Sequence, residues 1–130
     1  MPSGGELWIN RLAYEADLLI SEGFIEPHFF AGFSGGRKSV LPGVAARESV
    51  LANHCSEFIA HPKARTGVLP GNPIHEDMLW AAKNAKLRFI VNVVLNAENG
   101  DEATIAIKPA DEKKNVVIVG AGIAGLEAAR

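Results

Sequence analysis

The chain has 130 residues, of which 48% are hydrophobic, enough for one ordinary domain with a buried core. Its formal net charge of −2 and pI near 6.1 lack the basic excess of nucleic-acid-binding proteins, so we expect no nucleic-acid partner. Apolar runs fall far short of the roughly 20 residues of a membrane helix, and residues 1–6 lack the features of a signal peptide. The single Cys55 excludes an internal disulfide and favours a cytoplasmic setting.

The first third of the chain predicts two strands, a loop and a short helix. Residues 6–10 alternate in part between apolar and polar side chains, and residues 17–21 contain a continuous apolar run, so both are expected to be strands. Residues 23–33 form an irregular loop with a proline. A short helix starts near Ser34 and ends before Pro42, because proline interrupts helices.

Two further helices are expected in the middle of the chain. Residues 46–58 place Val50, Leu51, Cys55 and Phe58 near one face, as in an amphipathic helix. Residues 60–71, rich in proline and glycine, form a long loop. Asn72 and Pro73 then provide a cap and a first helical position, and that helix runs to about Ala85, with Glu76 and Asp77 as capping acidic residues.

The last third predicts strands and a change of composition. Residues 87–95 are a central strand, Asn99–Gly100 is a turn, and residues 104–107 are the returning strand. A charged linker at 108–114 precedes a strand at 115–119, which leads into a helix opened by glycines. The order of elements predicts an α/β fold with a three-layer-like arrangement of sheet and helices.

The segment EPHFFAGFSGGRK at residues 26–38 indicates chemistry rather than packing, because its apolar residues show neither the strand nor the helix period. Its histidine, His28, lies in a loop before two phenylalanines. It is a candidate general base whose pKa the rings could bring near the working pH, and a loop histidine stacked on aromatic rings is an equally good interpretation.

Residues 32–39 approach the phosphate-binding loop of nucleotide hydrolases, but Arg37 occupies the place of the second glycine, so this is not a Walker A loop. Gly35, Gly36 and Arg37 could still bind a phosphate, with Lys38 as a point charge or, if desolvated, a nucleophile. The alternative is a solvated Arg-Lys pair at a turn.

Three other histidines carry weaker signals. His54 is expected inside a helix, where adjacent His54 and Cys55 cannot face one metal, so single-histidine ligation requires another molecule to complete the shell. His61 and His75, on either side of the 60–71 loop, are interpreted as structural or solvent-facing.

The stretch from about Trp8 to Asn96 resembles the nickel-dependent lactate racemase family, most specifically at residues 23–38, 53–54 and 71–77. The resemblance implies a nickel-pincer nucleotide, which holds nickel through sulfur, carbon and sulfur. By motif, Lys38 resembles the lysine that attaches this cofactor, His54 the protein ligand of nickel, and His28 one of two acid/base histidines. The implied reaction is racemisation of a small 2-hydroxy acid by proton-coupled hydride transfer.

The same resemblance implies that the chain is an internal piece of a longer enzyme. In the family, the second acid/base histidine and the arginine that binds the substrate carboxylate precede this piece, and a second domain follows it. A complementing chain would have to supply them, so independent activity is uncertain on these grounds.

The end of the chain resembles a different family. Gly120, Gly122 and Gly125 form a G-x-G-x-x-G pattern between a strand and a helix, similar to the FAD- or NAD(P)H-binding start of enoate-reductase-like flavoproteins. The acidic ribose ligand expected about 20 residues later lies beyond the chain, so FAD or NAD(P) would bind only a complete fold. Residues 1–105 are thus a racemase-like cofactor-binding segment, and residues 106–130 a linker and truncated dinucleotide-binding unit.

Two alternatives to the racemase fragment remain open. One is a non-catalytic module whose glycine loop binds an anion or a nucleotide. The other is a piece of a flavoprotein oxidoreductase in which residues 120–125 are the functional site.

Overall fold

The computed structural model describes residues 1–95, 103–105 and 116–120. Four α-helices and one 3-10 helix lie in this part of the chain: α1 (Arg11–Tyr14), η1 (Gly36–Ser39), α2 (Arg47–Asn53), α3 (Ser56–Ile59) and α4 (Pro73–Asn84). The strands are β1 (Leu18–Phe24), β2 (Pro27–His28), β3 (Gly32–Phe33), β4 (Leu87–Leu95), β5 (Ala103–Ile105) and β6 (Val116–Gly120).

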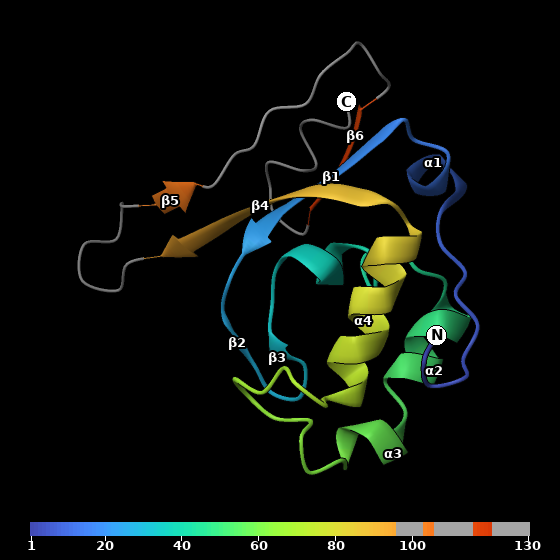
Figure 1. The fold of residues 1–130 in the computed structure, drawn as a ribbon, viewed down its shortest axis with the longest axis vertical. Coiled ribbons are helices and arrows are strands. Elements are labelled where there is room, and N and C mark those ends of the chain that lie inside the picture. The colour runs from blue at the N-terminus through green and yellow to red at the C-terminus, as the bar shows by residue number, and fades with distance from the viewer. Residues whose placement is uncertain (96–102, 106–115, 121–130) are drawn as a thin grey trace.

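The main sheet has the order β5-β4-β1-β6 (Figure 1). Strand β1 pairs in parallel with both β4 and β6, and β5 runs antiparallel at the edge. Strands β2 and β3 form a separate small hairpin. These helices and parallel strands confirm the expected α/β class, and the predicted strand at 87–95 is confirmed.

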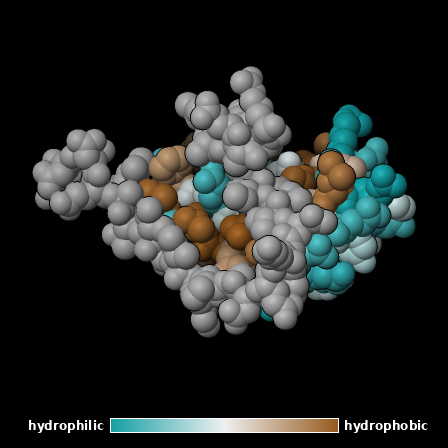
Figure 2. All heavy atoms as spheres, turned by 90° about the horizontal axis from the view of Figure 1, so that it is seen from above, coloured by the Kyte–Doolittle hydropathy of each residue, from teal (hydrophilic) through white to brown (hydrophobic). Residues whose placement is uncertain are grey.

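Helices α2, α3, α4 and η1 lie on one side of the main sheet (Figure 1). Their contact with the sheet buries an apolar core that includes Leu19 of β1, Val40 and Leu41 after η1, and Ile74 and Met78 of α4. The second helical layer of the expected three-layer arrangement is not seen among the described residues. A view from above shows hydrophobic side chains gathered on the opposite side (Figure 2).

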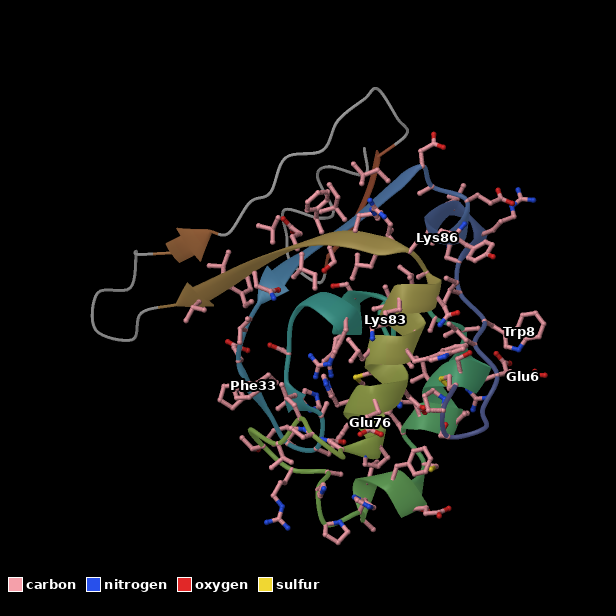
Figure 3. All side chains as sticks on the ribbon, viewed as in Figure 1. Glu6, Trp8, Phe33, Glu76, Lys83 and Lys86 are labelled. Carbon is pink, nitrogen blue, oxygen red and sulfur yellow. The ribbon has the colours of Figure 1, made fainter. Side chains whose placement is uncertain are left out.

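The N-terminal segment departs from the prediction. Residues 6–10 were expected to form a strand, but only Ile9 makes an isolated bridge, to Ala45. The backbone of Trp8 is held instead by the Ser49 hydroxyl, which accepts from the Trp8 N–H at 2.7 Å. Figure 3 shows Trp8 beside Glu6, whose carboxylate accepts a hydrogen bond from the indole N–H at 3.1 Å. The segment therefore packs along α2 and does not join the sheet.

The helix expected over residues 46–58 is also wrong, because it is two helices. Helix α2 ends at Asn53, and Cys55 has the extended conformation, with φ −70° and ψ 157°, before α3 begins. Leu51, expected on the buried face, is 52% exposed, whereas Val50 and Phe58 pack against the core. The break places His54 at the end of α2 and not inside a helix.

Helix α4 confirms its predicted signals. The Asn72 side chain accepts from the N–H groups of Ile74 and His75, and Pro73 occupies the first helical position. Glu76 lies in the first turn, where its carboxylate accepts from Gly71 N–H at 3.0 Å, and Lys83 lies in the last turn (Figure 3). Both charges complement the helix dipole.

Asp77 has a different role from the capping one expected. It is 1% exposed and accepts hydrogen bonds from the N–H and the hydroxyl of Ser3, at 3.0 and 2.5 Å. The Asn53 amide donates to the same carboxylate at 3.4 Å. Asp77 therefore joins the N-terminal segment, α2 and α4.

The C-terminal strand joins the main sheet. Strand β6 pairs with β1 from Leu18↔Val116 to Glu22↔Gly120, so the predicted strand at 115–119 is present with a one-residue shift. The Asn99–Gly100 turn, the linker at 108–114 and the helix expected after Gly120, with Gly122 and Gly125, lie outside the described residues.

Candidate functional site

The candidate site follows the carboxyl end of β1, the edge at which ligands bind in open parallel sheets. The chain passes through the β2–β3 hairpin, which carries His28, and then into η1, which carries Lys38. The hydroxyl of Ser34 closes the base of the hairpin, because it donates to the Phe24 carbonyl at 2.6 Å and accepts from Glu26 N–H at 2.8 Å. The hairpin thus returns the chain to the sheet.

Two polar side chains of the sheet fix the start of η1. Asn92 of β4 accepts from the N–H of Gly36 at 3.1 Å, and Ser21 of β1 donates to the carbonyl of Gly36 at 3.1 Å. A Cβ at Gly36 would lie 2.8 Å from Ile90, and one at Gly35 would lie 2.9 Å from Asn92 Oδ1. Glycines therefore allow η1 to lie directly on the sheet.

Aromatic contacts connect the two histidines that the sequence predicts as functional. The ring of Phe30 lies edge-on to His28, with centroids 4.7 Å apart, and edge-on to His54, with centroids 5.4 Å apart. His28 comes from the hairpin and His54 from the end of α2. The structure thus brings together residues that are far apart in sequence.

The hydrogen bond of His54 determines which ring nitrogen is available. Its Nδ1 lies 3.1 Å from the carbonyl oxygen of Val50. A carbonyl only accepts, so Nδ1 carries the proton and Nε2 of the neutral ring keeps a free lone pair. Burial, the largest influence, and the charge of Lys38 lower the pKa of His54, although the bond to Val50 raises it. A neutral imidazole in this tautomer fits a metal ligand.

His28 has the opposite arrangement. Its Nδ1 accepts from the N–H of Ala31 at 3.3 Å, so the proton of the neutral ring is on Nε2. Burial lowers the pKa of His28, as do the charges of Lys38, His54 and Arg37, in that order. We therefore expect a neutral ring that presents an N–H at Nε2.

Lys38 is a partly buried cation with a lowered pKa. Burial, and then the charge of Arg37, lower its pKa from 10.5 to about 8. In the described part of the chain, the ion pair found is Arg11–Glu15, which is exposed and remote from η1 in sequence. The site therefore gathers positive and titratable nitrogen groups without a carboxylate in ion-pair contact.

Gly36 and Arg37, predicted to bind a phosphate, have partners within the protein. The N–H of Gly36 donates to Asn92. The guanidinium of Arg37 donates to the carbonyls of Ala31, Phe33 and Ser34, at 2.7, 2.9 and 3.4 Å. These donors are engaged in this conformation.

Sequence reasoning missed two members of the site. Asn92 is the only polar side chain in the apolar 89–95 run, which was a usable signal of a specific contact. His75 is half-buried, not simply solvent-facing, and its Nδ1 is buried without a hydrogen-bond partner in the described part of the chain. Burial and then the charge of Arg37 lower its pKa, while Glu76 raises it. No sequence pattern indicates that His75 lies close enough to Arg37 to feel its charge.

The described residues contain neither a membrane-spanning helix nor a cluster of metal-ligating side chains. No helix among them is long and apolar enough to cross a membrane. No group of three or more His, Cys, Asp or Glu side chains among them could hold a metal ion. A metal at His54 would thus need donors from a bound group.

The fold and the site define an α/β domain with a lysine of lowered pKa and two neutral histidines at the carboxyl end of a parallel strand. Residues 1–67, just over half of the 130, match the model of the lactate racemase N-terminal domain. The chain belongs to this family.

Relatives from two bacteria support the assignment. The chain is 69% identical over 99 residues to the lactate racemase of Thermoanaerobacterium thermosaccharolyticum, which covers 76% of this chain and 23% of the relative. It is 66% identical over 98 residues to the lactate racemase of Lactiplantibacillus plantarum, with 75% and 23% covered. The chain thus spans about a quarter of the length of these relatives.

Solved structures agree with the fold. The lactate racemase apoprotein from T. thermosaccharolyticum superposes with a TM-score of 0.76 at 65% identity, covering 81% of this chain and 25% of that one. A protein from Thermotoga maritima superposes with a TM-score of 0.53 at 30% identity, covering 75% of this chain and 24% of that one.

A shorter sequence match of 43 residues is 58% identical to the bilirubin reductase of Mediterraneibacter gnavus, covering 33% of this chain and 7% of that protein.

Proposed function

We propose that this chain is the cofactor-attachment segment of a 2-hydroxyacid racemase that uses a nickel-pincer nucleotide. One observation supports this most: an amine of lowered pKa at Lys38 and a histidine with a free Nε2 at His54 belong to the same site as His28. These three side chains are the ones that the family resemblance singles out. The family membership indicates a racemase, and the geometry of Lys38 and His54 supports their proposed roles in holding the cofactor and nickel.

The residues of the site fit such a cofactor. A single imidazole with Nδ1 bonded to the Val50 carbonyl can provide one nitrogen ligand to nickel, and the cofactor would provide the other donors. The positive charges of Lys38 and its neighbour Arg37 would attract an anionic nucleotide without direct contact from Arg37. When bound, the cofactor would supply nickel and an acceptor that takes the C2 hydrogen of the substrate with its electron pair and returns it.

Lys38 would hold the cofactor as a thioamide, through a condensation of its amine with a thiocarboxylate that forms a C–N bond and releases water. A pKa of about 8 leaves an appreciable fraction of neutral amine near pH 8, and a neutral amine is the nucleophilic form. Partial burial and the neighbouring Arg37 charge produce this state without a separate base. Attachment is therefore expected to be faster above pH 8 than below it.

His28 would exchange a proton with the substrate hydroxyl. In this conformation it presents the Nε2 proton, which suits hydrogen bonding to the oxygen of a hydroxy or keto acid. Accepting a proton at Nε2 requires the tautomer with Nδ1 protonated, which would release the bond to Ala31 N–H. That bond is long, at 3.3 Å, so its release costs little.

Racemisation of a 2-hydroxy acid would need groups beyond His28, Lys38 and His54. Inversion at C2 calls for a second acid/base group on the opposite face and a cation for the substrate carboxylate. The chain matches about a quarter of its racemase relatives, so we propose that a complementing polypeptide supplies those groups.

Intact-mass measurement tests the proposal directly. The chain is co-expressed with enzymes that make the nickel-pincer nucleotide, then analysed for mass and metal. We expect an adduct that peptide mapping places on Lys38, with nickel at up to one equivalent. Lys38→Ala should lack the adduct, and His54→Ala should keep the adduct and lose nickel. An unmodified, nickel-free wild-type chain would favour a non-catalytic anion-binding module.

A second candidate is a fragment related to FAD- or NAD(P)H-dependent flavoproteins, the class that the C-terminal sequence resembles, and the short match to a bilirubin reductase is in keeping with a reductase relative. The glycine pattern that begins at Gly120 is the observation behind it. Flavin binding would be measured by fluorescence for the full chain and for a chain ending at Ile105. Retention of flavin by the shorter chain would rule out residues 120–125 as its site.

A further inference from the structure

The loop between His28 and η1 has an unusual feature: each of five consecutive carbonyls accepts a hydrogen bond. Asn72 Nδ2 donates to the carbonyl of Phe30 at 2.8 Å, and the N–H of Gly67 donates to the carbonyl of Gly32 at 3.0 Å. The other three acceptors are the carbonyls of Ala31, Phe33 and Ser34, and all three are held by Arg37. Arg37 therefore holds three of the five carbonyls, while the Ser34 hydroxyl closes the base of the hairpin.

The guanidinium of Arg37 is suited to this arrangement. Arginine has five N–H donors in a planar fork, and one terminal nitrogen of Arg37 donates to two carbonyls while the other donates to the third. No carboxylate forms an ion pair with Arg37 in the described part of the chain. Its Nε is buried. The loop carbonyls therefore take the place that a carboxylate or phosphate usually has beside an arginine.

Arg37 also connects the two functional side chains of η1 and the hairpin. It lies next to Lys38 in the same turn, and the carbonyls that it holds lie between His28 and η1. The ring of Phe30, at the start of this loop, contacts the imidazole of His28. Movement of the loop would thus change the position of His28 relative to Lys38.

We propose that Arg37 is a positioning residue, whose guanidinium holds the carbonyls of Ala31, Phe33 and Ser34 and thereby keeps His28 and Lys38 directed at the same site. The proposal deepens the proposed function, because it presupposes that these two side chains act together. It gives Arg37 a role in shaping the site, in place of direct contact with a phosphate.

The test uses the full chain without cofactor and compares three variants. Arg37→Gln removes the charge and the fork, Arg37→Lys keeps the charge without the fork, and Arg47→Gln removes an exposed positive charge at the start of α2 as a control. The first measurement is the NMR shift of the His28 ring protons at pH 8, where the ring is neutral. The edge-on Phe30 ring shifts these signals, so they report on the position of His28.

The second measurement is amide hydrogen exchange over residues 26–34. We expect both Arg37 variants to move the His28 signals towards those of a free histidine and to raise exchange about tenfold or more, with Arg47→Gln unchanged. Wild-type signals and exchange in a folded Arg37→Gln, or their full rescue in Arg37→Lys, would overturn the proposal. If Arg37→Gln does not fold, Arg37→Lys decides alone.

These measurements separate the proposal from the proposed function. They require no cofactor, so a failure of Lys38 to acquire an adduct leaves their outcome unaffected. Conversely, an adduct on Lys38 together with an unmoved His28 in both Arg37 variants would support the cofactor and reject the positioning role.

Discussion

At the scale of single residues, the lowered pKa of Lys38 makes stability depend on pH in a defined direction. The pKa is about 8 in the folded chain against 10.5 for an ordinary lysine. Between these values the unfolded state binds more protons than the folded state, so stability rises with pH. Below about pH 8 the folded chain carries the full cost of a partly desolvated cation.

We therefore predict that Lys38→Met is more stable than the wild type at pH 7, and that this gain shrinks as the pH rises through 8 towards 10.5. The shift would correspond to several kcal/mol if fully buried, but solvent screening of a half-buried group reduces the expected gain to about 1 kcal/mol. Urea unfolding at pH 7 and pH 10 measures it. Lys83→Met, at an exposed position in the last turn of α4, should show no such pH-dependent gain.

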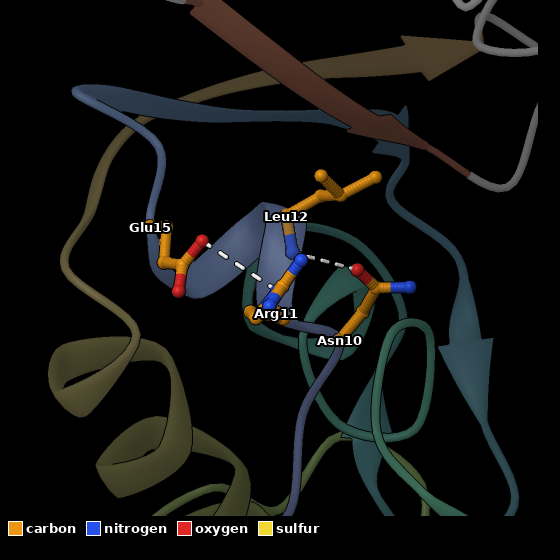
Figure 4. A network of polar contacts seen from close by, with 4 residues as sticks. All are labelled: Asn10, Arg11, Leu12 and Glu15. Carbon is orange, nitrogen blue, oxygen red and sulfur yellow. Dashed lines mark hydrogen bonds and ion pairs between the residues drawn. The ribbon is translucent and has the colours of Figure 1, made fainter.

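Two asparagine caps allow a second comparison at this scale. Asn72 is fully buried, caps α4 through Oδ1, and donates from Nδ2 to the carbonyls of Phe30 and Val68. Asn10 is exposed and caps α1 with one bond, to Leu12 N–H at 2.9 Å; the neighbouring ion pair is Arg11–Glu15 (Figure 4). The same residue type thus has one local role and one long-range role.

Asn72→Ala is predicted to lower the free energy of unfolding by about 2 kcal/mol, because it removes a cap and leaves two part-buried carbonyls without this donor. Asn10→Ala should cost only about 0.5 kcal/mol, as expected for an exposed cap of a short helix. Urea midpoints at constant m-value give both numbers. Equal losses in the two variants would contradict the long-range role of Asn72.

At the scale of elements, the β2–β3 hairpin depends on a glycine for two separable reasons. Gly32 has φ +80°, and a Cβ there would lie 2.6 Å from both the Val68 carbonyl oxygen and Leu69 Cδ2. Gly67 has a similar φ of +76°, but the nearest atom to its Cβ would be Phe33 Cζ, at 3.9 Å. An alanine would have the same backbone strain at both positions, but only at Gly32 would its Cβ collide with neighbouring atoms.

Gly67→Ala should accordingly cost about 1–2 kcal/mol, the strain of a left-handed alanine. Gly32→Ala should cost at least about 2 kcal/mol more, because the loop at 68–69 must move away from the hairpin. Thermal unfolding of the two single variants, together with the His28 ring signals, checks this. The hypothesis of a steric contact fails if both alanines cost the same.

Elements with local signals were predictable from the sequence, and elements defined by distant contacts were not. Helix α4 has its cap, proline and charge pattern within its own residues, and β4 is rich in Val, Ile and Leu. The break between α2 and α3, at His54 and Cys55, contains no glycine or proline that would predict it. Residues 6–10 looked like a strand, but their backbone partners lie at 44–49, which no local pattern reveals.

The candidate site shows the same division. His28, Lys38 and His54 were identified by motif. The structure brings His28 and His54 together on either side of Phe30, and the charge of Lys38 lowers the pKa of both histidines. The carbonyl contacts of Arg37 could not be predicted, because a cation beside glycines suggests a phosphate until the loop geometry is known. The extended Cys55 that separates α2 from α3 likewise gives His54 its position only in three dimensions.

At the scale of the whole molecule, the two central strands support the site through one polar side chain each. Ser21 of β1 donates to the carbonyl of Gly36, and Asn92 of β4 accepts from its N–H. The start of η1 therefore depends on the β1–β4 pairing. Strand β1 is paired on its other edge with β6. The C-terminal strand can thus influence the site without contacting it.

This arrangement predicts the effect of removing β6. A chain ending at Ile105 would leave Leu18–Glu22 of β1 without its partner, and an unpaired parallel edge exchanges amide hydrogens faster and tends to associate with other chains. We expect faster exchange across residues 18–24 and a larger apparent mass in sedimentation than for a chain ending at Gly120, which keeps β6. Ser21 of this strand donates to the Gly36 carbonyl, so loosening β1 should also disturb the start of η1 and raise exchange at the Gly36 N–H, which donates to Asn92 of β4. Equal amide exchange and equal apparent mass in the two chains would mean that β6 does not protect the edge of β1. The racemase-like segment would then fold without the C-terminal strand.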